Sequence, residues 1–144
     1  MKKIMVYLIL GGLLISGCGG GTASQKPIKS DLNYEIIDTE KEDFKTNREL
    51  NNWYSDNYQV RGTHKMNSQG RTYILISDGP KTSGGYNMEV VAIKTNPSFI
   101  TIATKVTKPQ TDQVTTTVMT YPHVLIAIPE DKRNIIWEDK TGYR

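Results

Sequence analysis

The stretch Arg71-Thr72-Tyr73-Ile74-Leu75-Ile76-Ser77 decides how the rest of the chain is interpreted. Residues 73–76 are apolar at four consecutive positions, whereas a strand with one solvent-exposed face alternates apolar and polar residues. A strand that is apolar on both sides has both faces covered. The sequence therefore predicts a central strand with other elements packed above and below it.

Further strands are predicted on both sides of this stretch. Apolar or β-branched segments between turn sequences lie at residues 33–38, 59–66, 86–95, 99–107, 114–128 and 135–137. The second half of the long segment 114–128 follows Pro122, which breaks or bulges the strand because proline cannot donate to a ladder. Within residues 86–95, alternate positions are expected on one side of the strand: Tyr86, Met88, Val90 and Ala92. Within residues 99–107, Ile100, Ile102, Thr104 and Val106 alternate with Thr101, Ala103 and Lys105.

Residues 40–58 form the one segment with convincing helical spacing. One face is shared by Leu50, Trp53, Tyr54 and either Asn57 or Tyr58. Residues 46–49 have the spacing of a capping box, although residues 39–42 offer a competing start. The apolar stripe predicts a helix that covers a sheet, with an exposed partner-binding stripe as the alternative. The predicted fold is mainly β (α+β), with five or six mostly antiparallel strands in a sandwich or partly open barrel and one N-terminal covering helix.

The N-terminus has the pattern of a signal peptide. Lys2 and Lys3 precede an apolar run at residues 4–15, which is too short to cross a bilayer as a helix. The ending Leu14-Ile15-Ser16-Gly17-Cys18 resembles the bacterial lipobox, in which the cysteine sulfur is acylated before cleavage ahead of it; an ordinary secretory signal is the alternative. We expect a signal at residues 1–17, a lipidated Cys18 with a flexible tether to residue 32, and one domain at residues 33–144. The protein would then be lipid-anchored at the extracytoplasmic face of the cell membrane.

Charge and cysteine content exclude several classes of function. When Lys2 and Lys3 leave with the signal, the 18 basic residues become 16 against 15 acidic ones, so the mature chain carries a net charge of +1. The sequence has no dense Lys/Arg cluster of the kind that would indicate a nucleic-acid partner. Lipidation of Cys18, the one cysteine, leaves none for a disulfide, a metal site or a thiol nucleophile.

Catalytic patterns are missing from the sequence. His64 and His123 are the two histidines, and neither has a carboxylate at helical or alternate-strand spacing. Ser77-Asp78-Gly79 has no accompanying base, and no phosphate loop, nucleophile elbow or metal-binding helix is found. The sequence predicts a protein that is not an enzyme and needs no cofactor or metal.

Three patterns occur in a fixed order along the chain. They are residues 73–79, residues 82–90 with Gly84-Gly85-Tyr86, and residues 114–126 with Tyr121-Pro122. Gly84 and Gly85 permit positive φ and close approach of another segment, and Tyr86 would place its ring on the core and its hydroxyl at the rim. A tight turn beside a core-edge tyrosine explains the same residues without a binding role.

Together these patterns resemble the C-terminal domain of the PrcB family, over residues 73–128. The family is named for the lipoprotein subunit of a spirochaete protease complex. His123 stands where the family pattern has an aromatic residue, a role that Tyr121 can fill. The resemblance implies a noncatalytic lipoprotein domain that binds and stabilises a partner such as a secreted protease. It places the candidate binding residues at Gly84, Gly85, Tyr86, Tyr121 and Pro122.

A second hypothesis keeps the anchor but changes what is bound. Aromatic side chains could stack on a glycan or peptide of the cell wall, namely Trp53, Tyr54, Tyr86 and Tyr121. Pull-down from solubilised membranes separates the two hypotheses, because a stable protein partner supports assembly and retention on purified cell wall without protein supports the second.

Overall fold

The computed structural model describes residues 29–109 and 117–142, which fold into two β-sheets and two short helices. The elements in chain order are β1 (Lys29–Ser30), β2 (Glu35–Ile36), α1 (Glu42–Thr46), α2 (Arg48–Asn57), β3 (Gly62–Ser68), β4 (Arg71–Ser77), β5 (Asn87–Thr95), β6 (Phe99–Thr107), β7 (His123–Pro129) and β8 (Asn134–Asp139). Six strands have six residues or more, and β1 and β2 have only two each. The predicted class, mainly β with one helical region before the long strands, is confirmed.

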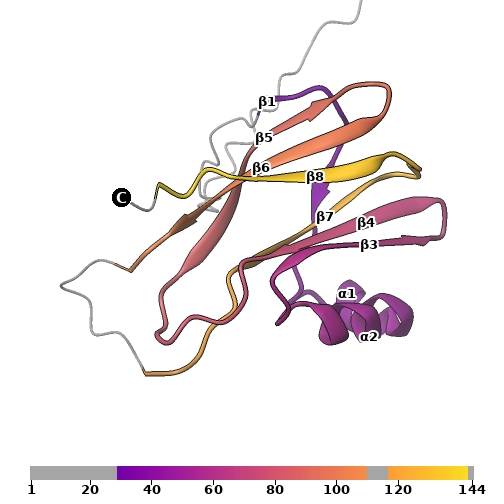
Figure 1. The fold of residues 1–144 in the computed structure, drawn as a ribbon. Helices are drawn as coiled ribbons and strands as arrows, with labels where there is room; N and C mark the ends of the chain where they lie inside the picture. The colour runs from indigo at the N-terminus through magenta and orange to yellow at the C-terminus, as the bar shows by residue number, and fades with distance from the viewer. Residues whose placement is uncertain (1–28, 110–116, 143–144) are drawn as a thin grey trace, which may run out of the picture.

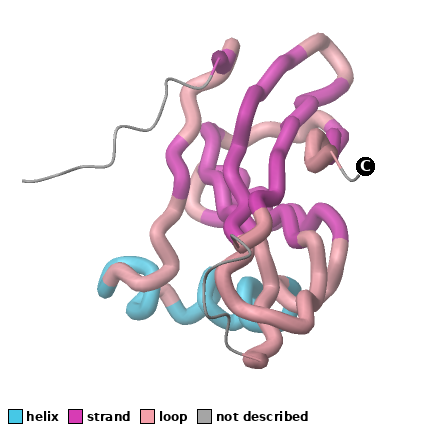
Figure 2. Tube along the Cα trace, turned by 90° about the vertical axis from the view of Figure 1, so that its left-hand side faces the viewer, coloured by secondary structure: helices cyan, strands magenta, loops and turns pink. Residues whose placement is uncertain are grey.

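The two sheets face each other and the helices form a third layer (Figure 1). One sheet has the order β1-β5-β6-β8 and the other the order β2-β7-β4-β3. Four pairings are antiparallel, while β1 with β5 and β6 with β8 are parallel. Figure 2 shows both helices gathered at one side of the strands, beneath the β2-β7-β4-β3 sheet in the view of Figure 1. Of the two predicted architectures, the structure adopts the sandwich.

Strand β4 occupies the centre, as its sequence predicts. It pairs with β3 on one side and β7 on the other, and residues 72–77 are all buried. Ile74 and Ile76 face the other sheet, whereas Tyr73 and Leu75 face the helices. The run of consecutive apolar residues therefore serves two cores, one on each face.

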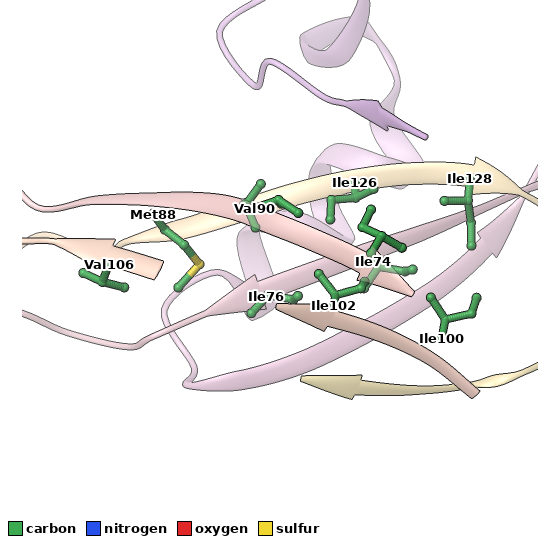
Figure 3. Close-up of a cluster of buried hydrophobic side chains, with 11 residues drawn as sticks. Ile74, Ile76, Met88, Val90, Ile100, Ile102, Val106, Ile126 and Ile128 are labelled. Atoms are coloured by element: carbon green, nitrogen blue, oxygen red, sulfur yellow. The ribbon is translucent and has the colours of Figure 1, made fainter. Parts of the chain in front are cut away.

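The larger core lies between the sheets (Figure 3). Branched side chains from four strands fill it: Ile74, Ile76, Val90, Ile93, Ile100, Ile102, Val106, Val124, Ile126 and Ile128, with Met88. The alternation predicted for β6 is confirmed, since Ile100, Ile102 and Val106 are buried there together with Thr104. Burial of each such aliphatic side chain contributes about 1.5–3 kcal/mol, so this core is the main source of stability.

Strand β5 departs from its predicted alternation. A β-bulge lies between Val90 and Ala92, and the extra residue Val91 points outward and is 37 % exposed. Beyond the bulge Ile93, only 1 % exposed, takes the inward position. The prediction that Ala92 continues the inward row is wrong, because one inserted residue reverses the side-chain phase of a strand.

The predicted helix is divided in two at Asn47. The Asn47 side chain accepts a hydrogen bond from the Leu50 backbone nitrogen at 3.2 Å and so caps α2. Thr46, expected in this capping role, instead ends α1 by donating to the Glu42 carbonyl at 3.0 Å. The covering function is confirmed, because Phe44 of α1 and Leu50 of α2 are buried against Tyr73 and Leu75.

The last long strand is shorter than predicted. β7 begins at His123, directly after Pro122, and residues 117–122 lie outside the ladders apart from one bridge at Thr120. The missing N–H of Pro122 explains why the ladder starts after it. The rest of the predicted strand, at residues 114–116, lies outside the described residues.

The N-terminal strand reaches into the predicted tether. Lys29 and Ser30 of β1 pair with Ala92 and Ile93 of β5, ahead of the predicted domain start at residue 33. Cys18 and the predicted signal lie outside the described residues. Neither helix within residues 29–109 and 117–142 is long and apolar enough to cross a membrane.

Candidate functional site

Two loops at one end of the sandwich are joined to each other, and we call them the paired loops: residues 78–86 and residues 117–122. The backbone nitrogen of Lys81 donates to the Thr120 carbonyl at 2.8 Å, and the Thr120 nitrogen donates back to Lys81 at 3.0 Å. The Thr120 hydroxyl also donates to the Ser83 carbonyl at 2.7 Å. The structure thus brings the segment carrying Gly84-Gly85-Tyr86 beside the segment carrying Tyr121-Pro122, as the sequence hypothesis requires.

The double glycine has the conformational role predicted for it at Gly85. Gly85 has a φ of +83°, and a Cβ placed on it would lie 2.8 Å from the Cβ of Pro109. Gly84 is buried, and the Tyr86 ring packs on the inter-sheet core. The segment that comes close to the glycine is therefore the chain's own β6 exit, which favours a structural role for this turn.

The exposed apolar surface of the paired loops lies next to Tyr121. Val118 and Met119 are 62 % and 55 % exposed. The Tyr121 hydroxyl donates to the Met119 sulfur at 3.2 Å, and the Tyr121 ring meets the Tyr58 ring edge-on with centroids 5.5 Å apart. These four residues, Val118, Met119, Tyr121 and Tyr58, form what we call the apolar tip. Met and Tyr are residue types enriched in protein–protein interfaces.

An aromatic cluster behind the apolar tip anchors it to the helices. Tyr58 stacks on Tyr54 with ring centroids 5.1 Å apart, and both rings contact His123. His123 Nδ1 lies 2.6 Å from the Tyr121 carbonyl oxygen, and Nε2 lies 2.7 Å from the Tyr54 hydroxyl. Because a carbonyl can only accept, Nδ1 carries a proton, and in the neutral ring Nε2 accepts from Tyr54. Both nitrogens of His123 are engaged in holding β7, the loop and α2 together.

A buried carboxylate fixes the start of the first loop. Asp78, whose side chain is 3 % exposed, contacts Lys81 Nζ at 2.7 Å and Arg61 Nε at 3.1 Å. Its backbone nitrogen donates to the Pro122 carbonyl at 2.9 Å, so Pro122, which is itself buried, helps to position this loop. A carboxylate at this depth requires such cationic partners, because an unpaired buried charge is strongly destabilising.

The polar groups considered for chemistry are engaged in structural bonds. The Ser77 hydroxyl donates to the Tyr58 carbonyl at 2.6 Å and accepts from the Gly79 nitrogen at 3.1 Å. His64 lies on the edge strand β3, and its Nε2 is 3.1 Å from the carbonyl oxygen of Val60, which precedes that strand. Among the described residues, no group of three His, Cys, Asp or Glu side chains is placed to hold a metal ion.

The aromatic residues proposed for stacking on a glycan or peptide divide between the two cores. Trp53 and Tyr54 pack on the helix-facing core, whereas Tyr86 packs on the inter-sheet core on the other side of β4 and β7. Only Tyr121 belongs to the apolar tip. The sequence does not predict that Tyr58, Val118 and Met119 belong to this surface. Residues 114–128 have the pattern of one strand, and the pairing of residues 117–122 with residues 78–86 leaves no signal in the local sequence.

Comparison with known proteins assigns the region that contains this site. The family model described as PrcB C-terminal matches residues 72–129. Residues 72–129 are therefore similar to the PrcB C-terminal family. The resemblance predicted over residues 73–128 is confirmed. No curated protein and no solved structure matches the chain.

The PrcB C-terminal match covers a defined part of the molecule. It spans β4 to β7 and the paired loops, including the Gly84-Gly85-Tyr86 turn and the exposed residues Val118 and Met119. The helices, β3 and β8 lie outside it. The matched region therefore contains the central strands and three of the four residues of the apolar tip, and the preceding segment contains the helical layer and Tyr58.

Proposed function

We propose that this chain is a membrane-anchored bacterial lipoprotein whose PrcB C-terminal domain is a noncatalytic docking and assembly module for an extracytoplasmic protein, such as a secreted protease. The similarity of residues 72–129 to the PrcB C-terminal family supports a role associated with a protease complex. The lipobox-like ending at Cys18 supports the anchor, since two acyl chains hold a protein firmly where one binds marginally.

The observation that carries the docking role is the apolar tip. Val118 and Met119 expose most of their surface on loops that are fixed by backbone hydrogen bonds, a buried ion pair and an aromatic cluster. An exposed apolar group on a fixed backbone binds with less loss of conformational freedom than one on a loose loop. Anchoring would add to this by raising the local concentration of the protein at the membrane.

The anchor is tested by Cys18→Ala, with the wild-type chain as reference. The variant is expected to accumulate as unprocessed precursor or to appear in the medium. Normal processing and unchanged retention in the membrane fraction would contradict lipidation at Cys18.

The docking role is tested by Val118→Asp combined with Met119→Asp, because a charge at the centre of an apolar contact must be desolvated. A partner that co-purifies with the wild-type chain from solubilised membranes is expected to be lost, with the melting temperature unchanged because both side chains face solvent. Ile136→Asp on β8 is the matched control, since Ile136 is 41 % exposed on the other sheet. Equal retention by the double variant would contradict docking at the apolar tip, and retention on purified cell wall without a protein would favour the glycan or peptide alternative.

A further inference from the structure

A concave surface separate from the apolar tip lies toward the start of α2. It is a cleft of about 290 Å³ between β2, the helices and the edge of the β2-β7-β4-β3 sheet. Leu50 near the start of α2 lines it, whereas Tyr58 at the C-cap of α2 belongs to the apolar tip. Since Leu50 and Tyr58 are eight residues apart, the two surfaces are about 12 Å apart along the helix.

The lining of this cleft is mixed, and its apolar part lies at the floor and along one wall. Phe44, Leu50 and Tyr73 contribute the small part of their surfaces that packing leaves open, and Ile36 forms a wall that is 37 % exposed. The volume is at the lower end of the range for small-molecule sites, so the cleft suits one or two side chains of a larger molecule.

The rim of the cleft is charged, and acidic groups predominate. Glu35, Asp38 and Asp43 line it together with two cations, Lys41 and Arg71. Arg71 is already bound to Glu35 at 2.6 Å, and this contact raises the pKa of Arg71 above its ordinary value. The carboxylates of Asp38 and Asp43 are exposed to solvent at the rim.

The acidic character extends over the whole helical layer. Residues 31–58 contain eight acidic and three basic residues, a net charge of −5, whereas residues 59–144 contain seven acidic and eleven basic residues, a net charge of +4. A surface of one sign steers binding partners of the opposite sign.

We propose that this cleft binds a short basic segment of a protein partner, which inserts one large apolar side chain while flanking lysine or arginine residues face Asp38 and Asp43. Ile36, together with the open parts of the floor residues, provides the apolar contact, and the carboxylates provide orientation. The proposal shares with the proposed function only the assumption that the partner is a protein, because the cleft and the apolar tip have no lining residue in common.

The test uses the purified full-length chain and a fluorescein-labelled peptide of sequence Lys-Lys-Phe-Lys-Lys at low ionic strength. Binding is measured by anisotropy, and the site by backbone amide shifts, which are expected to concentrate at Ile36, Leu50 and Tyr73. Replacing the peptide's phenylalanine with serine is expected to weaken binding about tenfold through loss of the buried ring. Absence of binding, or shifts concentrated at residues 117–122, would overturn the proposal.

A pair of charge variants separates the cleft from the general acidic surface. Asp38→Asn with Asp43→Asn is expected to weaken binding about three- to tenfold. Glu42→Gln with Asp56→Asn removes the same charge from exposed positions of the same layer that do not line the cleft, and is expected to change binding less than twofold. Equal losses in the two pairs would overturn the proposal. Self-association that is sensitive to salt and abolished by Asp38→Asn with Asp43→Asn, but not by the control pair, would overturn the proposal in favour of a second copy of this chain. Val118→Asp, on the apolar tip, is expected to leave binding of the peptide to the cleft unchanged.

Discussion

The Nε2 atom of His123 lies 2.7 Å from the hydroxyl oxygen of Tyr54, which is 69 residues away in sequence. This contact connects the first residue of β7 to α2. The other ring nitrogen of His123 holds the Tyr121 carbonyl at 2.6 Å, so one imidazole joins the helical layer to the loop that carries the apolar tip.

Tyr54→Phe is expected to lower the free energy of unfolding by about 1 kcal/mol, because it removes the hydroxyl and leaves His123 Nε2 without this partner. Urea denaturation measures the change. His64→Ala, on the edge strand β3, serves as the control and is expected to cost less. A Tyr54→Phe variant as stable as wild type would show that the hydrogen bond contributes nothing to this junction.

Alkaline conditions are expected to weaken the same junction. Burial raises the pKa of Tyr54 above its ordinary value of 10.0, against a smaller lowering by a hydrogen bond with Thr39. The unfolded chain therefore loses this proton first as pH rises, and the stability due to Tyr54 declines from about pH 10 up to its raised folded pKa. The stability difference between wild type and Tyr54→Phe, measured from pH 8 to 11, is expected to shrink above pH 10. A difference that stays constant over this range would contradict the account.

Gly85 and Gly70 provide a matched pair for the double-glycine turn. Both have positive φ, at +83° and +74°, but an added Cβ meets Pro109 at 2.8 Å only at Gly85 and has no atom within 4 Å at Gly70. Gly70→Ala is expected to cost about 1 kcal/mol for the backbone conformation alone, and Gly85→Ala about 2–4 kcal/mol because a steric clash is added. Equal melting temperatures for the two variants would show that Pro109 yields without cost.

The two cations that hold Asp78 are expected to contribute unequally. Lys81 is 22 % exposed and 2.7 Å from the carboxylate, whereas Arg61 is 61 % exposed and 3.1 Å away. Lys81→Met is expected to destabilise the fold by about 2–3 kcal/mol and Arg61→Met by about 1 kcal/mol or less, since solvent screens the second pair. Thermal unfolding of both variants checks this order, and the reverse order would contradict the assignment of Lys81 as the main partner.

The fold was predictable where side-chain patterning is local and regular. The consecutive apolar residues of β4 and the alternation in β6 each determine which faces are buried, and both predictions are confirmed. The bulge at Val91 and the helix break at Asn47 are not predicted from the sequence, because each depends on one residue that shifts a regular pattern. Val91 is an extra residue in a strand, and Asn47 is an N-cap that competes with Thr46.

The candidate site was predictable only in part. The positive φ of Gly85 follows from residue type, and the packing of Tyr86 follows from its position before a strand. Tyr54 and Tyr58 each contact His123 across more than 60 residues of sequence, so no local periodicity indicates that His123 joins them. The exposure of Val118 and Met119 depends on the pairing of Lys81 with Thr120, which only the folded chain reveals.

Site-specific photocrosslinking in the producing cells tests the central claim, docking of a protein partner at the apolar tip, most directly. A photoreactive phenylalanine analogue at position 118 is compared with the same analogue at position 136. Both positions are exposed, but position 118 lies on a paired loop and position 136 on strand β8. The account predicts one discrete protein adduct from position 118, none of that mass from position 136, and loss of the adduct when Met119→Asp is added. Adducts of equal yield from both positions, or none from position 118, would contradict it.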